Sequence, residues 1–140
     1  VLSQISFLLP CQSNPAQAIN GMMVPIQGFP GKGSDAVNAA YSKMTGQPFM
    51  DAEALTGYTN LWVVAKALEK AGSAKPEDVH KALKSLHLVN DPQMSLLPGG
   101  SDFRFGPNGR RMGAEVMIIQ WQQGVPKVIF PDALANAKPI

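Results

Sequence analysis

Two side chains in the middle of the sequence have the chemistry for binding a small ligand. The carboxylate of Glu53 stands at the start of a predicted helix, and the phenol of Tyr58 follows within that helix. Free backbone amides and a polar side chain at a helix start can together meet a small ligand, and a phenol can reach a polar cleft. Two structural explanations stay open: Glu53 as a solvated acid favoured by the helix dipole, and Tyr58 as a core residue.

Other titratable residues do not form a catalytic or metal-binding set. No serine or cysteine is matched with a histidine base and an orienting acid. His80 and His87 are spaced by about two turns of a predicted helix, too far to share a metal without a bend. Glu77 and Asp78 are adjacent, so they do not face each other, and both suit a helix start. We therefore expect no enzyme activity, no metal and no cofactor.

Two further features have ordinary structural explanations. The run Gly28–Gly33 is rich in glycine but lacks the residue order of a phosphate-binding loop, so it is predicted to be a plain loop. Cys11 is the only cysteine and cannot form an internal disulfide, so it is interpreted as structural or incidental.

Composition indicates a folded domain with no affinity for nucleic acid. Of the 140 residues, 45% are hydrophobic and 16% are charged, which favours a core over disorder. The formal net charge is only +2, and apart from Arg110 and Arg111 the basic residues are scattered. No apolar run approaches the roughly 20 residues that span a bilayer, and the apolar patch at Ile5–Pro10 lacks the basic flank of a signal peptide.

The best-formed predicted element is a helix from Asp51 to Gly72. Asp51 can accept a hydrogen bond from the first-turn amides, and Gly72 can take the left-handed conformation that ends a helix. Apolar residues recur between these ends at steps of three and four, which predicts one buried stripe. Its members are Tyr58, Leu61, Trp62, Ala65 and Leu68.

Shorter elements precede and follow this helix. A short helical turn is expected near residues 16–19, and a strand over residues 21–27, where Pro25 favours an edge. Ser34 is predicted to cap a second helix that ends at Gly46, and Pro76 to open a third. After Leu88 the pattern changes to strands and turns. The expected strands are residues 103–105, 115–122 and 125–130, with a turn at 107–109, a hairpin at Gln123-Gly124 and a tail with at most one helical turn.

This order of elements is awkward for a complete domain. One strand, three helices and a hairpin leave the apolar helix faces without a large sheet to cover. The sequence also begins at Val1, without an initiator methionine or a recognisable signal. We therefore expect part of a longer protein, whose exposed helix faces would be covered by self-association if these residues were all that is present.

Five motifs in a fixed order carry a family resemblance. They are Gly57-Tyr58, residues 67–72, residues 76–83, residues 103–109 and residues 118–124. From about Gly21 to the tail, this order resembles the C-terminal part of type I periplasmic solute-binding proteins, and more narrowly the branched-chain amino acid class of ABC transporter receptors.

The resemblance implies an α/β fold of two lobes that close on a ligand by hinge motion. This chain would be a C-terminal fragment of that fold, with three helices followed by a β-hairpin region. Within a partial domain of residues 1–140, residues 21–88 would supply mainly first-lobe helices. Residues 89–140 would supply hinge and second-lobe strands with the tail.

By the same resemblance, the protein would be the extracytoplasmic solute-binding component of an ABC importer, located in the periplasm or outside the cell in association with the membrane. It would bind a small organic solute, an amino acid or an aromatic acid, and its partner would be a membrane permease. The segment just before the Gly-Tyr helix borders the cleft in this family, which makes Asp51, Glu53 and Tyr58 the candidate ligand-binding residues. The family often has an apolar or aromatic residue where Glu53 stands, and a carboxylate there would pair with a ligand ammonium or exclude carboxylates. The rival roles are a ligand-sensing module of a receptor or regulator, and an enzyme whose turnover Glu53→Gln would abolish.

Overall fold

The computed structural model describes residues 18–140, so the expectations for Cys11, the apolar patch at 5–10 and the start of the turn at 16–19 lie outside it. The helices are α2 (Asp35–Thr45), α3 (Ala52–Ala71) and α4 (Pro76–Lys84), with a short 3₁₀ turn at Met94–Leu96. The strands are β1 (Met23–Ile26), β2 (His87–Val89), β3 (Asp102–Arg104), β4 (Met117–Gln122) and β5 (Val125–Phe130). The mixed α/β class and the three helices agree with the sequence prediction.

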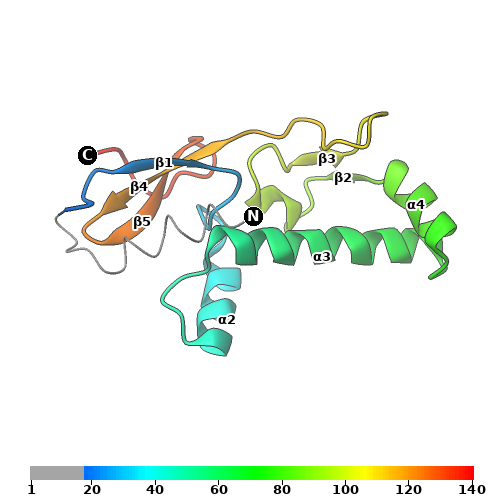
Figure 1. Cartoon of the computed structure of the whole chain (residues 1–140), viewed down its shortest axis with the longest axis horizontal. Coiled ribbons are helices and arrows are strands. Elements are labelled where there is room, and N and C mark those ends of the chain that lie inside the picture. Colours follow the sequence, from blue (N-terminus) through cyan, green and yellow to red (C-terminus); the bar gives the residue numbers. More distant parts are fainter. Residues whose placement is uncertain (1–17) are drawn as a thin grey trace.

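The elements are arranged along α3, the longest of the described helices (Figure 1). A three-stranded antiparallel sheet in the order β1-β4-β5 lies towards one end of the molecule. The two-stranded sheet β2-β3 and helix α4 lie towards the other end, while α2 projects away from the start of α3. Helix α3 therefore connects two regions with different partners.

The three-stranded sheet is formed by the predicted hairpin and the predicted edge strand. Gln123 and Gly124 have φ angles of 53° and 81°, the positive values that a tight two-residue hairpin turn needs. Strand β1 is at the edge of the sheet, where the missing amide hydrogen of Pro25 is tolerated. Both predictions are confirmed.

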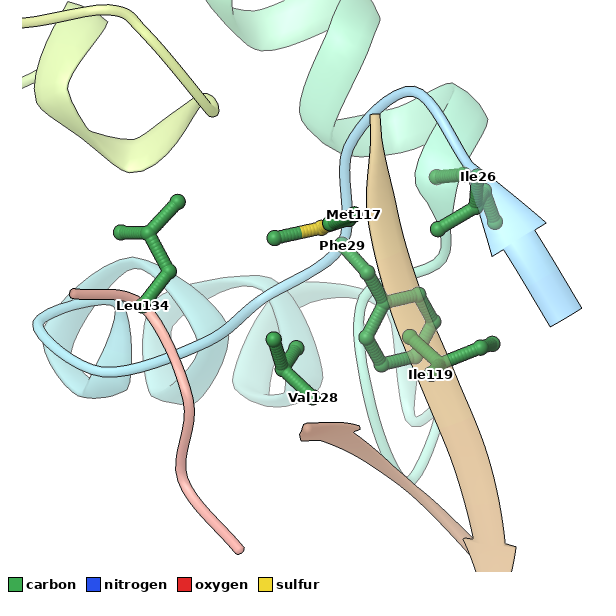
Figure 2. Close-up of a cluster of buried hydrophobic side chains, with 7 residues drawn as sticks. Ile26, Phe29, Met117, Ile119, Val128 and Leu134 are labelled. Carbon is green, nitrogen blue, oxygen red and sulfur yellow. The ribbon is translucent and has the colours of Figure 1, made fainter. Parts of the chain in front are cut away.

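One face of this sheet covers a compact apolar core (Figure 2). Met117 and Val128 are fully buried, and burying such a side chain contributes roughly 1.5–3 kcal/mol. The other members of the cluster are Ile26, Phe29, Ala52, Ile119 and Leu134. Ala52 belongs to the first turn of α3 and Leu134 to the C-terminal tail, so the sheet core also fixes the start of the helix and the end of the chain.

The C-terminal tail is held against the sheet by side-chain hydrogen bonds. Asn136 accepts the Val128 amide hydrogen at 2.9 Å. Gln120 is almost fully buried, and its Oε1 accepts the Ile140 amide at 3.0 Å while its Nε2 donates to the Gly21 carbonyl at 3.1 Å. A buried amide needs such partners, and Gln120 finds them at both ends of the described chain.

The predicted ends of α3 are confirmed. Asp51 Oδ1 accepts the Ala54 amide at 2.8 Å, and Gly72 has a φ of 61° with its amide donating to Leu68. Ser34 occupies the predicted N-cap position of α2, but its side chain does not cap the helix. Its hydroxyl donates to the Gly31 carbonyl instead, at 2.5 Å, and makes no cap hydrogen bond. Ser34 is buried in the loop, so its hydroxyl is used to close that loop.

The predicted buried stripe of α3 is wrong. Leu61 is 73% exposed and Leu68 is 40% exposed, while Tyr58, Trp62 and Ala65 are only partly buried. At about 100° per residue, the buried face is roughly opposite the predicted stripe. It consists of Ala52, Leu55, Thr59, Val63 and Ala67.

The physical reason is that α3 is apolar around most of its circumference. The spacing of apolar residues cannot identify the buried face of such a helix, because large apolar side chains occur on several sides of it. The neighbouring elements select the face with small residues, where Ala67 allows close approach and the Thr59 hydroxyl donates to the Leu55 carbonyl at 3.0 Å.

The region after α4 differs from the predicted long third helix. The helix ends at Lys84, and His87 lies in strand β2, opposite Arg104 of β3. Phe103 and Leu88 face each other in this short ladder, and both pack in a cluster with Val63. A strand of three residues is too short to be predicted from alternating apolar and polar residues. Pairing with β3 therefore decides the extended conformation of β2.

Contacts cross the predicted boundary between residues 88 and 89. Strand β1 pairs with β4 across that boundary, and β2 itself spans the boundary and pairs with β3. The assignment of residues 21–88 and 89–140 to separate lobes stays a prediction.

Candidate functional site

Asp51 and Glu53 have different roles at the start of α3. The Asp51 carboxylate is engaged by the Ala54 amide and therefore fixes where the helix begins. Glu53 is half-buried in the first turn and makes no hydrogen bond or ion pair with residues 18–140. Of these two candidates, Glu53 keeps a carboxylate available for a ligand.

Tyr58 lies on another side of the helix from Glu53. Five residues at about 100° each leave the two side chains about 140° apart around the axis. Tyr58 is half-buried and packs against a cluster that contains Met50, Leu55 and Leu96. None of the hydrogen bonds found within residues 18–140 involves its hydroxyl. The structure therefore does not bring Glu53 and Tyr58 to one point.

A groove with a volume of about 380 Å³ lies beside the middle of α3. Thr56, Asn60 and Val64 line it from the helix. Glu53 is on the same side of α3, because the seven residues to Asn60 make nearly two full turns. The rest of the apolar lining comes from α4, from the 3₁₀ turn and its end, and from β3 and the residue after it: Leu83, Met94, Leu97, Phe103 and Phe105.

Two polar atoms of the groove lining have no hydrogen-bond partner among the described residues. They are Thr56 Oγ1 and Arg111 Nε, both shielded from solvent. A buried polar group without a partner costs roughly 1–3 kcal/mol, and such groups are rare. Their presence in the lining of one groove therefore marks this place as unusual.

The Arg111 guanidinium is held in a defined position. Its Nη2 donates to the Pro98 carbonyl, and its central carbon lies 5.8 Å from the centre of the Phe103 ring. Burial lowers the pKa of Arg111 below its ordinary value, and the negative charge of Glu115 acts in the opposite direction. An arginine ordinarily titrates far above neutrality, so Arg111 stays cationic at neutral pH despite this lowering of its pKa.

Sequence reasoning missed Thr56, Asn60 and Arg111 as candidate residues. The available signal for the helix was that Thr56 and Asn60 are one turn apart on the side of Glu53. In the sequence, Arg111 stands out only as one of two adjacent arginines. Nothing in the sequence showed that the turn after β3 would bring it to α3.

The two histidines are not brought together as a metal pair. His80 is exposed on α4, whereas His87 Nε2 is 2.5 Å from Asp102 Oδ1 across β2-β3. The hydrogen bond from His87 lowers the pKa of the exposed Asp102 carboxyl, with a smaller contribution from Arg104. In residues 18–140 no three His, Cys, Asp or Glu side chains are grouped to hold a metal ion.

None of the helices in residues 18–140 combines the length and apolar character needed to cross a membrane.

Comparison with known proteins identifies a family across most of the chain. Residues 8–126 match the family described as periplasmic binding protein. The Leu/Ile/Val-binding protein homolog 7 of Brucella suis biovar 1 (strain 1330) is 30% identical over 96 residues, which are 69% of this chain. The Leu/Ile/Val-binding protein homolog 8 of Brucella abortus (strain 2308) is 29% identical over 105 residues, which are 75% of this chain.

A solved structure shares the fold. The leucine-binding protein LivK from Thermotoga maritima MSB8 superposes with a TM-score of 0.59 at 17% sequence identity and covers 80% of this chain. The matched part is 31% of LivK, 23% of the first Brucella protein and 25% of the second. This chain therefore spans about a quarter of the length of the curated relatives that it matches.

Proposed function

The chain belongs to the periplasmic binding protein family, and we propose that it forms the C-terminal part of a solute-binding protein that serves an ABC importer. The match over residues 8–126 carries this proposal. In the full-length protein, a small organic solute binds between two lobes in the periplasm, and the closed form docks on a membrane permease.

The proposed solute is an amino acid, with an aromatic acid as the alternative. The Brucella relatives are named for leucine, isoleucine and valine, and LivK for leucine. Glu53 supports an amino acid, because a half-buried carboxylate without a partner among the described residues suits an ammonium group.

The proposed contact residues at this end of the chain are Glu53 and Tyr58, with Asp51 setting the start of the helix. Tyr58 offers a hydroxyl that no described hydrogen bond uses, and its ring packs in a cluster with Met50 and Leu55. Because Glu53 and Tyr58 lie on different sides of α3, the solute would contact one of them directly and the other through neighbouring residues of the cleft.

The test is a thermal-shift screen of the full-length protein with leucine, isoleucine, valine and aromatic acids. A true solute at about 100 times its Kd should stabilise the protein by roughly 2.7 kcal/mol. Glu53→Gln should weaken binding of an amino acid, while Glu77→Gln, which changes an exposed acid of α4, should leave it unchanged.

Stabilisation by no small solute would contradict the proposal. If an aromatic acid without an ammonium group stabilised the protein and no amino acid did, the aromatic-acid alternative would replace the amino acid.

Self-association of the chain is a separate part of the proposal. Leu61, Val64 and Leu68 are all at least 40% exposed on α3, and their spacing places them on one side of the helix. We expect light scattering of the 140-residue chain to show oligomers, and a stable monomer would contradict this part.

A further inference from the structure

The groove beside α3 has the features of a binding site, and neither Glu53 nor Tyr58 belongs to its lining. We propose that this groove binds a small monocarboxylate with an apolar or aromatic body, whose carboxylate pairs with Arg111. This site is additional to the proposed solute site. The solute site lies between two lobes of the full-length protein, whereas every residue that lines the groove belongs to this chain.

Arg111 supplies the cationic end of the site. Its Nη2 is held by the Pro98 carbonyl, while its Nε has no partner and its Nη1 makes no hydrogen bond within the described residues. A guanidinium that has lost part of its hydration is best compensated by a carboxylate, because charged hydrogen bonds are roughly twice as strong as neutral ones. The bond to Pro98 holds the guanidinium before a ligand arrives, which reduces the entropy lost on binding.

The lining supplies the apolar end. Val63, Met94 and Phe103 are at most 7% exposed and belong to one hydrophobic cluster, so they give the site a firm apolar wall. A volume of about 380 Å³ falls within the usual range for small-molecule sites. Thr56 and Asn60 add a hydroxyl and an amide on the α3 side, which can fix the orientation of a bound acid.

The charges at the groove favour a ligand with one carboxylate over a ligand with two. Arg111 is the only charged residue among the described residues that line it. Glu115 is near enough for its charge to act on Arg111, although it is not part of the lining. A second ligand carboxylate would therefore meet no cation and would be repelled by Glu115.

The first experiment compares charged and neutral probes on the unaltered 140-residue chain. Phenylacetate and 4-methylpentanoate are titrated against the matched amides, with binding followed by calorimetry and by amide NMR shifts of Thr56 and Phe103. We expect each carboxylate to bind at least about tenfold more tightly than its amide. Equal affinity for acid and amide, or no binding of either acid at millimolar concentration, would overturn the proposal.

Variants then assign the preference to Arg111. Arg111→Gln should remove the difference between acid and amide, and Arg111→Lys should keep part of it. Arg110→Gln removes the same charge from the adjacent exposed residue, which does not line the groove, so it should preserve the difference. Loss of the preference in Arg110→Gln alone would refute the assignment.

A further variant remains informative if Arg111→Gln fails to fold. Glu115→Gln removes the opposing charge and should tighten binding of phenylacetate about two- to fivefold at low salt. Weaker binding would count against Arg111 as the anchor. Stabilisation of the full-length protein by an aromatic acid belongs to the groove if Arg111→Gln removes it and to the interlobe solute site if Arg111→Gln keeps it, so either proposal can fail without the other.

Discussion

The two ends of the molecule bury their apolar residues in different ways. At the sheet end, strands, tail and the first turn of α3 close around one core, with Met117 and Val128 completely buried. At the groove end, α3 packs on α4 and β2-β3 through a narrow face and leaves Leu61 and Val64 exposed. The apolar core at the sheet end is therefore covered by residues of that end, whereas the groove end leaves apolar and polar groups available for a ligand.

The difference also appears in the polar groups. Gln120 at the sheet end is buried and uses both its oxygen and its nitrogen in hydrogen bonds. At the groove end, Thr56 Oγ1 and Arg111 Nε are shielded without a partner among the described residues. Satisfied buried groups contribute to stability, whereas unsatisfied ones in a groove are suited to a ligand.

The largest predicted effect comes from truncating side chains at the two ends. Ile119→Ala at the sheet end should lower the free energy of unfolding by about 2–5 kcal/mol, because Ile119 is only 1% exposed. Leu61→Ala on α3 should change it by less than about 0.5 kcal/mol. Urea denaturation followed by circular dichroism at low protein concentration measures both. A comparable loss in the two variants would show that Leu61 is covered in solution.

The next effect concerns the N-cap of α3, the helix that connects the sheet end with the groove end. Asp51→Ala removes the acceptor for the Ala54 amide and should cost about 1 kcal/mol in the same unfolding experiment. Asp51→Asn keeps an acceptor oxygen and should recover most of the loss. If Asn restored nothing, the effect would come from charge and not from the cap.

A gain in stability is predicted within α3. Gly57 lies in the helix with nothing within 4 Å of where a Cβ would be, so Gly57→Ala should stabilise the protein by about 0.5–1 kcal/mol. Gly31 gives the contrast at the sheet end, because its Cβ would lie 2.3 Å from the Leu134 carbonyl oxygen. Gly31→Ala should therefore destabilise, and a gain there would contradict the closed packing of the tail.

The smallest effect is a pH dependence at β2-β3. The hydrogen bond from His87 lowers the folded-state pKa of Asp102 below its ordinary value of 3.8. Its contribution to stability is therefore present above that value and is lost as the pH falls through the folded-state pKa. His87→Ala should raise the Asp102 pKa towards 3.8 in a carboxyl NMR titration, and His80→Ala should not change it. An unchanged Asp102 pKa in His87→Ala would show that the pair does not form in solution.

Local signals in the sequence determined the elements and their ends. Asp51 and Gly72 bound α3, Gln123-Gly124 makes the hairpin, and Pro25 places β1 at an edge, because caps, tight turns and proline act within a few residues. The order of motifs also identified the family, since each motif is a local feature.

The tertiary structure alone decided which surfaces meet. The apolar circumference of α3 allowed several buried faces, and contacts with distant strands selected the one with Thr59 and Ala67. The Ser34 hydroxyl at the N-cap of α2 donates to the Gly31 carbonyl instead of capping the helix, and pairing with Arg104 places His87 in β2. The groove of Thr56 and Arg111 depends on residues 55 positions apart in the chain, and only packing determines such a distance.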